Sequence, residues 1–486
     1  MSLPLPRLSR TPRAMLTGMA GVLGVTLLLT GCANTGEEET TPTAQAGADV
    51  AGEPDTSHLD CAEGALPLGQ IMSSGSAWSM CFSVDPKRGM VLSDVHFAPA
   101  DRGPVRLIQE MTLAQMEVPY DDGERLTSDI TEAGFGGMRM HTLTEDECTG
   151  ERLGLEIPNI GDGEHGSTPE REVLCSETQD SGLAYRSHAD GQLTVARGDE
   201  WRLSTISKVG WYEYISEYTF GSDGSIRPAL GATGDLSPVD YTDEEHGWPI
   251  GDGDVDYAAS HSHNVVWRIH WGLGEDEDMV VEQYDAEPTG EMGSQSPIVE
   301  GSLTRIDEPS LHEGDDRRWW RVIAPDLLNA NDHPVSYEIN LGVSDSFTFV
   351  HDEHHHGEDV GYDVAFTNHD ECQVFATRNR GGCGRSVQDY VEDDSGTLDD
   401  VVSWVAVGYH HVPRDEDQSP MELHWQSFTM GPRDFTSTRA DVPEEREGID
   451  GVPEDSEFTR GLDEDEDGRD IDLDDLDDDL HLEEQD

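Results

Sequence analysis

Residues 209–234 combine a run of strand-forming residues with a short polar turn. Aromatic and β-branched residues are frequent from Trp211 to Phe220, and Gly221-Ser-Asp-Gly224 follows them. Such residues favour strands, and a cluster of glycine, serine and aspartate between two apolar runs favours a turn. The segment therefore predicts a β-hairpin, in which Tyr212 would ordinarily be a structural residue of a sheet.

The two ends of the chain differ from the part between them. Residues 33–59 are mostly Gly, Thr, Ala, Pro and acidic residues with almost nothing to bury, which is typical of a flexible linker. From about Glu444 onward the acidic residues repel one another and favour disorder. The roughly 380 residues between these ends can bury a large core. We predict a linker at 32–59, one all-β domain at 60–440 and an acidic disordered tail at 441–486.

Residues 1–31 predict an export signal. Three arginines precede an apolar run from Met15 to Leu29, and Thr30-Gly-Cys32 follows. A basic head, a short apolar core and a small-residue cleavage site describe a secretory signal. Cysteine at the cleavage point is typical of a bacterial-type lipoprotein, in which Cys32 carries the lipid. The alternative is an uncleaved transmembrane anchor, for which the run is short. We expect an exported protein that Cys32 anchors at the outer face of the cell membrane.

The net charge of the chain argues against a nucleic-acid partner. The formal net charge is −72, and lysine occurs only at Lys87 and Lys208. Acid spread over the whole surface keeps a protein soluble and is repelled by a phosphate backbone. We therefore expect no nucleic-acid partner, and we interpret the acidity as an adaptation to high salt.

The cysteines indicate disulfides. With Cys32 assigned to lipidation, six of the seven cysteines remain. An even number in an exported protein predicts disulfides, and six cysteines allow 15 connectivities. A zinc site is the alternative, although the sequence contains no Cys-x-x-Cys. Pairing each cysteine with its neighbour would give Cys61–Cys81, Cys148–Cys175 and Cys372–Cys383.

Two His-x-His patterns differ in their surroundings. With twenty histidines in the chain, one such pattern is expected by chance. His354-His-His356 lies in a polar run without periodicity. His261-Ser-His263 opens a segment in which alternate residues form one face of a strand, so both imidazoles could hold one ion.

A borderline metal such as Cu(II) or Zn(II) needs a third ligand beside two imidazoles. The apolar run from Val401 to Val407 ends in His410 and His411, followed by Pro413. One of these histidines is the candidate third ligand, although a structural histidine is equally compatible with the pattern.

Taken in chain order, these segments resemble the catalytic domain of copper amine oxidases, which carry a quinone made from a tyrosine. The similarity extends over most of residues 80–437. It includes "RGMVLSDVHF", "RLIQEMTLAQMEVPY" and "EVLCSETQDSGLAYR". It also includes the hairpin segment that continues to Ala232-Thr-Gly234, and His261-Ser-His263 at a suitable distance from Tyr212. In "YHHVPRDEDQSPM" the histidine before the hydrophobic-Pro pair matches the third copper ligand.

The resemblance implies a large twisted antiparallel β-sandwich that forms a homodimer. It implies oxidation of primary amines by O2 to aldehydes, with release of ammonia and hydrogen peroxide. A Cu(II) ion near a phenol favours the phenolate and lets oxygen add to the ring, which is how a tyrosine becomes topaquinone. The residues to which the resemblance assigns roles are Tyr212 as the topaquinone precursor, His261, His263 and His411 as copper ligands, Tyr120 at the quinone oxygen, and Cys148 and Cys175 as a disulfide.

The catalytic base is harder to place. An ungapped match to the family on Gly134-Phe-Gly136 puts Thr131 where the family has aspartate. Asp129 lies two residues earlier and is our choice for the base, with Glu132 as the alternative.

Other positions also depart from the family pattern. Trp211 replaces the asparagine that precedes the cofactor tyrosine, and an indole lacks the hydrogen-bonding capacity of an amide. Lys208 replaces a threonine. His270 and Gly272 stand where two aspartates of a calcium-type site belong, so we do not expect calcium, although Asp400 resembles a remnant ligand.

We interpret the chain as a minimal, membrane-tethered copper amine oxidase domain. One alternative is a relative without activity that keeps the fold as a copper-binding or interaction module. Another is a metal-scavenging surface lipoprotein that uses His354–His356 and the acidic tail.

Overall fold

The computed structural model describes residues 54–442, apart from 159–166, 188–192, 239–240, 242–243, 252–255, 276–277, 343, 345–347, 350–359, 380–383 and 385. The predicted signal, Cys32, His354–His356, Cys383 and nearly all of the acidic tail lie outside the described residues. Among the described residues, no helix has the length and apolarity that crossing a bilayer requires.

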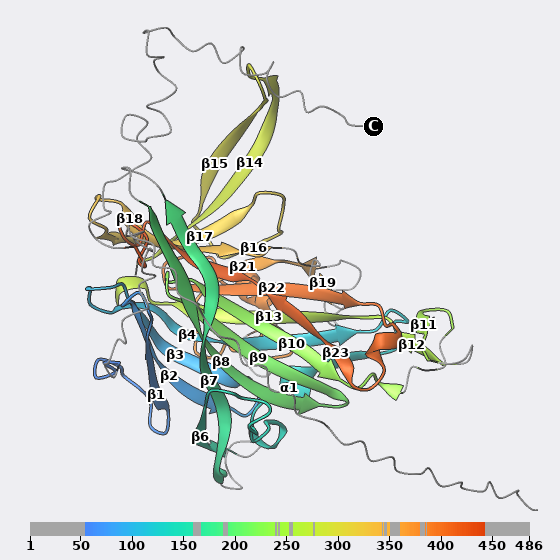
Figure 1. The fold of residues 1–486 in the computed structure, drawn as a ribbon. Helices are drawn as coiled ribbons and strands as arrows, with labels where there is room; N and C mark the ends of the chain where they lie inside the picture. Colours follow the sequence, from blue (N-terminus) through green and yellow to red (C-terminus); the bar gives the residue numbers. More distant parts are fainter. Residues whose placement is uncertain are drawn as a thin grey trace, which may run out of the picture. The chain divides into compact units, whose positions relative to one another are not determined.

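Strands dominate the described chain, in two large antiparallel sheets (Figure 1). The nine-stranded sheet has the order β1-β2-β3-β4-β13-β22-β21-β16, with β5 paired to β4. The bounds of these strands are β1 Leu66–Ile71, β2 Ala77–Asp85, β3 Gly89–Ala98, β4 Val105–Pro119, β5 Leu126–Ser128, β13 His261–Trp271, β16 Ser310–His312, β21 Val364–Asn368 and β22 Val401–His411. The prediction of an all-β antiparallel fold is confirmed.

The eleven-stranded sheet has the order β15-β14-β17-β18-β24-β10-β9-β8-β7-β6, with β23 paired to β10. Its strands are β6 Glu151–Pro158, β7 Ser167–Ser187, β8 Thr194–Val209, β9 Tyr212–Gly221, β10 Ile226–Gly234, β14 Val280–Met292, β15 Pro297–Ile306, β17 Trp319–Leu328, β18 Pro334–Asn340, β23 Met421–Ser427 and β24 Thr429–Arg433.

Short elements complete the described fold. Strand β11 (Gly247–Pro249) pairs with β12 (Tyr257–Ala259), and β19 (Thr348–Phe349) pairs with β20 (Val360–Gly361). The helices are α1 (Asp129–Glu132) and α2 (Val387–Asp393), and 3-10 turns cover Gly137–Arg139, Leu273–Glu275 and Asp415–Asp417.

The hairpin expected from residues 209–234 is β9 and β10, paired from Phe220 with Ile226 to Tyr212 with Gly234. Its turn needs glycine at position 224, because φ there is +92° and an added Cβ would lie 2.9 Å from the Phe97 ring. The turn thus packs against β3 of the other sheet.

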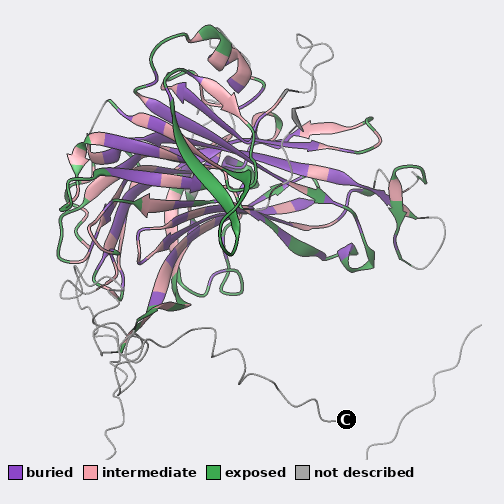
Figure 2. Cartoon of the chain, turned by 90° about the horizontal axis from the view of Figure 1, so that it is seen from above, coloured by how far each residue is buried: buried purple, intermediate pink, exposed green. Residues whose placement is uncertain are grey.

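The main core lies between the two sheets. Trp78 of β2 contacts Phe220 of β9 with ring centroids 5.0 Å apart, and Trp267 of β13 contacts Phe428 at 5.4 Å. Figure 2 shows the buried residues concentrated along these central strands. A second buried cluster, which includes Val266, Trp404 and Tyr390 of α2, covers the other face of β13 and β22. The two strands are therefore buried on both faces, which explains why residues 401–407 are apolar apart from Ser403.

Two disulfides join cysteines that are neighbours in the sequence. Cys61 pairs with Cys81, and Cys148 pairs with Cys175 in a small buried cluster with Leu143. The remaining pairing that we weighed, Cys372 with Cys383, cannot be described because Cys383 lies outside the described residues.

The β14–β15 hairpin stands apart from the core. Figure 1 shows its tip extending beyond the rest of the eleven-stranded sheet, and Figure 2 colours most of it as exposed. Its exposed apolar side chains are Met292, Ile298, Val299 and Leu303.

Candidate metal centre

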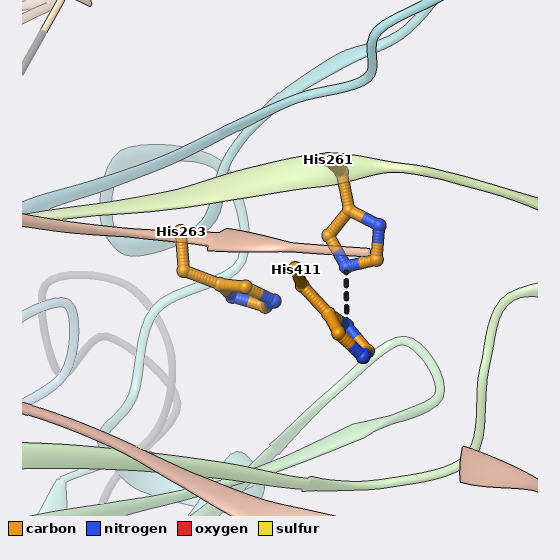
Figure 3. Close-up of side chains that lie close together, drawn as sticks. All are labelled: His261, His263 and His411. Carbon is orange, nitrogen blue, oxygen red and sulfur yellow. Dashed lines mark hydrogen bonds between the residues drawn. The ribbon is translucent and has the colours of Figure 1, made fainter. Parts of the chain in front are cut away.

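Three buried histidines gather on the inner face of the nine-stranded sheet (Figure 3). Antiparallel pairing places His261 of β13 directly opposite His411 of β22. His263 points to the same face as His261, because side chains alternate along a strand. One nitrogen from each ring lies within 4.8 Å of the other two, and all three side chains are buried. The structure therefore brings together the three residues predicted to bind copper.

Hydrogen bonds set which nitrogen of two rings is free to bind a metal. His261 Nδ1 lies 3.0 Å from the Ala259 carbonyl oxygen, so Nδ1 carries the proton and Nε2 keeps its lone pair. His411 Nε2 lies 3.0 Å from Asp417 Oδ2, so the His411 lone pair is on Nδ1. These two lone-pair nitrogens, His261 Nε2 and His411 Nδ1, face each other at 3.4 Å. In a four-coordinate site with bonds of about 2.0 Å, two donors lie roughly 3.3 Å apart.

His263 supplies the most direct test of whether the residues fit a metal. Its side chain is fully buried, yet neither ring nitrogen has a hydrogen-bond partner among the residues that the structure describes. Burying an imidazole without a partner is costly, and a metal bond would remove that cost. The three nitrogens fit a Cu(II) or Zn(II) ion.

Burial also keeps these rings neutral, the form that binds metals. It lowers the pKa of His261 to about 3, with further lowering by the neighbouring His411. The pKa of His263 lies well below its usual value, and burial lowers the pKa of His411. Neutral imidazoles at ordinary pH need lose no proton to accept an ion.

Tyr212 reaches the histidine cluster from the opposite sheet. It is the first residue of β9, and its hydroxyl lies 2.8 Å from His261 Nε2. The ring lies edge-on to His263 at 5.3 Å between centroids. Tyr120, the residue that follows β4, stacks on His261 at 4.8 Å between ring centroids. Both tyrosines singled out in the sequence therefore lie at the cluster.

Of the two candidates for the catalytic base, Asp129 lies near the histidine cluster. It opens α1, is 6% exposed, and accepts a hydrogen bond from the Tyr214 hydroxyl at 3.1 Å. Tyr214 in turn stacks on Tyr212, with ring centroids 5.9 Å apart. Burial raises the pKa of Asp129 to about 6, against the lowering effect of hydrogen bonds from Thr127 and Tyr214.

The other candidates for the base are placed elsewhere. Glu132 is exposed and pairs with Arg378 at 3.4 Å. The Thr131 hydroxyl bonds to the Gln115 amide at 3.0 Å. The geometry therefore favours Asp129 over Glu132.

The positions that depart from the family pattern are also placed. Trp211 lies in the turn before β9, and its side chain is 40% exposed. His270 bonds to Asp400 at 2.8 Å and stacks on His369 at 4.0 Å between centroids. His270, which the resemblance compares with a calcium ligand, is thus paired with Asp400.

Two residues of the centre were not predicted from the sequence. Asp417 holds His411 as described, and His424 of β23 packs against the His411 ring with centroids 4.4 Å apart. The motif after His411 contains three adjacent acidic residues, so the sequence did not single out Asp417. His424 stands in "MELHWQS", where buried and exposed residues alternate only from the middle of the strand onward.

Comparisons with known proteins agree with this geometry. A family model described as "Copper amine oxidase, enzyme domain" matches residues 74–447. The peroxisomal copper-containing amine oxidase alpha 2 of Arabidopsis thaliana is 24% identical over 394 residues, covering 74% of this chain and 57% of that protein. The primary amine oxidase of Arthrobacter sp. (strain P1) is 24% identical over 378 residues, covering 74% and 58%.

The fold is also similar to solved structures. The copper-containing benzylamine oxidase from Hansenula polymorpha has a TM-score of 0.64 at 21% identity, covering 83% of this chain and 66% of that chain. The chain thus spans a little over half the length of the two curated relatives.

Replacing His263 with alanine should weaken binding of the tightest Cu(II) ion by at least about a hundredfold, because even outer partners of metal ligands contribute about 10–100-fold. Competition with a chelator of known affinity measures the change. His410→Ala is the matched control. His410 adjoins His411, but its ring is partly exposed and bonds to Asp121 at 3.0 Å. Equal affinities of the His263→Ala and His410→Ala proteins would contradict the assignment.

Proposed function

The chain belongs to the copper amine oxidase family, and on this premise we propose that it oxidises primary amines with O2. The products are an aldehyde, ammonia and hydrogen peroxide. The observation that carries the proposal is the Tyr212 hydroxyl 2.8 Å from His261 Nε2, inside a buried group of three histidines. A copper ion there would favour the phenolate of Tyr212 and its oxidation to topaquinone, whose carbonyl is the electrophile that an amine needs.

The chain's own residues orient and protect this tyrosine. Tyr212 lies between the ring of Tyr214 and the edge of His263, and its side chain is buried. Tyr120 covers His261, and the Arg125 guanidinium lies 4.4 Å over the Tyr120 ring. These contacts restrict the tyrosine ring and exclude bulk water from it.

Asp129 is the proposed proton acceptor. A general base works best when its pKa lies near the working pH, and burial raises the pKa of the Asp129 carboxyl to about 6. Its contact with Tyr214 places it one ring away from Tyr212. In the proposed reaction Asp129 takes the proton from the carbon next to the amine nitrogen.

Tyr212→Phe should bind copper but form no quinone, because a ring without a hydroxyl has no phenolate to oxidise. Aerobic addition of copper to the apoprotein should give a visible band that phenylhydrazine shifts, and this band should be missing in the variant. Tyr218→Phe is the matched control, since Tyr218 lies on the same strand about 20 Å away. Copper-loaded native protein with an unmodified Tyr212 by peptide mass would overturn the oxidase proposal in favour of a copper-binding module.

Asp129→Asn should lower kcat/KM for a primary amine by roughly 10²–10⁴, the usual contribution of a general base. In the native protein kcat/KM should fall as the pH drops below about 6, because a protonated Asp129 cannot accept a proton. Peroxide release across pH, with a panel of primary amines, measures both effects. Glu132→Gln should leave the profile unchanged. An acid limb that persists in the Asp129→Asn protein would assign it to another group.

A homodimer is part of the proposal. The exposed apolar side chains of the β14–β15 hairpin support it, because a monomer would leave them in water. Light scattering of the chain that begins at Cys32 should give twice the mass of one such chain. A monomer at micromolar concentration would contradict it.

Export and lipidation at Cys32 are proposed from residues 1–32 alone. Mass spectrometry of the mature N-terminal peptide should find an acylated Cys32, and an unmodified Met1 terminus would refute this.

A further inference from the structure

Next to the three-histidine cluster lies a second group of buried histidine and aspartate side chains, which shares His411 with the first. His424 projects from β23, which pairs with β10 of the eleven-stranded sheet. Asp417 closes the 3-10 turn that follows β22. Asp417 is 1% exposed and His424 is 9% exposed. The proposed amine oxidation uses neither residue directly.

The three side chains His411, Asp417 and His424 have the separations of metal ligands. His411 Nε2 lies 3.0 Å from Asp417 Oδ2, and His424 Nε2 lies 3.6 Å from Asp417 Oδ1. One ligand atom from each of the three residues lies within 4.8 Å of the others. Donors around a four-coordinate ion with bonds of about 2.0 Å lie roughly 3.3 Å apart, between the two measured distances.

The two oxygens of the Asp417 carboxylate differ in their hydrogen bonds. Asp417 Oδ2 accepts from His411 and from the Arg414 backbone N–H at 2.9 Å. Asp417 Oδ1 and His424 Nε2 face each other at 3.6 Å, beyond the usual hydrogen-bond distance, and neither atom has a closer partner among the described residues. Buried polar atoms are nearly always paired, and an ion bound between these two atoms would satisfy both.

The other nitrogen of His424 is already engaged. His424 Nδ1 lies 3.3 Å from the Tyr409 hydroxyl, and the two rings stack at 5.1 Å between centroids. Histidines that bind metals usually donate the N–H of their second nitrogen to a carboxylate, a backbone carbonyl or water, which orients the ring, and the oxygen of the Tyr409 hydroxyl can accept in the same way. A proton on Nδ1 leaves the lone pair on Nε2, the atom that faces Asp417.

We propose that His424 Nε2, Asp417 and His411 Nε2 form a second site for a divalent ion of the copper or zinc class, with His411 bridging the two sites. Binding replaces the Nε2 proton of His411, which passes to solvent as the Nε2–metal bond forms. The carboxylate of Asp417 and the imidazolate of His411 together offset the two charges of the ion. This site requires His411 but not the conversion of Tyr212.

Metal content measures the proposal directly. The full chain is loaded with excess Cu(II), separated from loosely bound metal by gel filtration, and analysed for copper per chain. His424→Phe keeps a ring in the buried position but removes both nitrogens, and it should hold one ion fewer per chain than the native protein. The readout is this difference, because the His354–His356 run is present in both proteins. His410→Ala, in which a neighbouring histidine is lost, should show no difference.

Electron paramagnetic resonance supplies the second measurement. Two Cu(II) ions joined through an imidazolate couple their spins, so the native signal should integrate to less than its copper content. In His424→Phe the remaining ion should give its full signal, which also reports that the first site is folded. His424→Gln, which keeps a polar group in the buried position, should behave alike.

Equal copper in native protein and His424→Phe would overturn the proposal and leave a long His424–Asp417 ion pair as the explanation. Loss of all tightly bound copper from both His424 variants would also overturn it, since His424 would then only support the first ion. Neither result bears on Tyr212, whose oxidation is read separately by peptide mass.

Discussion

The antiparallel register between β13 and β22 is the constraint on which the centre depends. It sets His261 opposite His411 and, by strand alternation, His263 beside them on one face. A slip of one residue would turn the β13 histidines toward the opposite face, where Val266 and Trp404 pack. The register is held by apolar side chains on both faces of these strands, so two cores fix the position of three ligands.

The centre contains side chains from both sheets. Tyr212, Tyr214 and His424 come from the eleven-stranded sheet, whereas the three copper-binding candidates come from the nine-stranded one. Contacts such as that of Trp78 with Phe220 hold the two layers together away from the site. The distance from Tyr212 to His261 is thus set by packing across the sandwich rather than by local sequence.

Much of this arrangement could be predicted from the sequence, and the reasons differ by residue. The hairpin was readable because aromatic residues and a glycine turn act locally. The shared face of His261 and His263 could be predicted from strand alternation. The choice of His411 as the third ligand depended on the family resemblance, because nothing local distinguishes it from His410. Asp129 could not be separated from Glu132 in the sequence, since their environments differ only through the packing of α1. His424 was missed because its partners, Asp417 and Tyr409, are brought to it only by the fold.

The three histidines of the first cluster come from two distant parts of the chain, because His411 follows His261 at a sequence separation of 150. An unfolded chain would have to close that loop before it could gather the same nitrogens, which is entropically unfavourable. A metal ion held by these three nitrogens would therefore bind the folded chain more tightly than the unfolded one, and its binding would add to native stability by mass action. On the proposed function, the sandwich would have to form before the metal enters, and any chemistry on Tyr212 would come last. A mutation far from the centre that slows folding would consequently appear as a protein poor in metal.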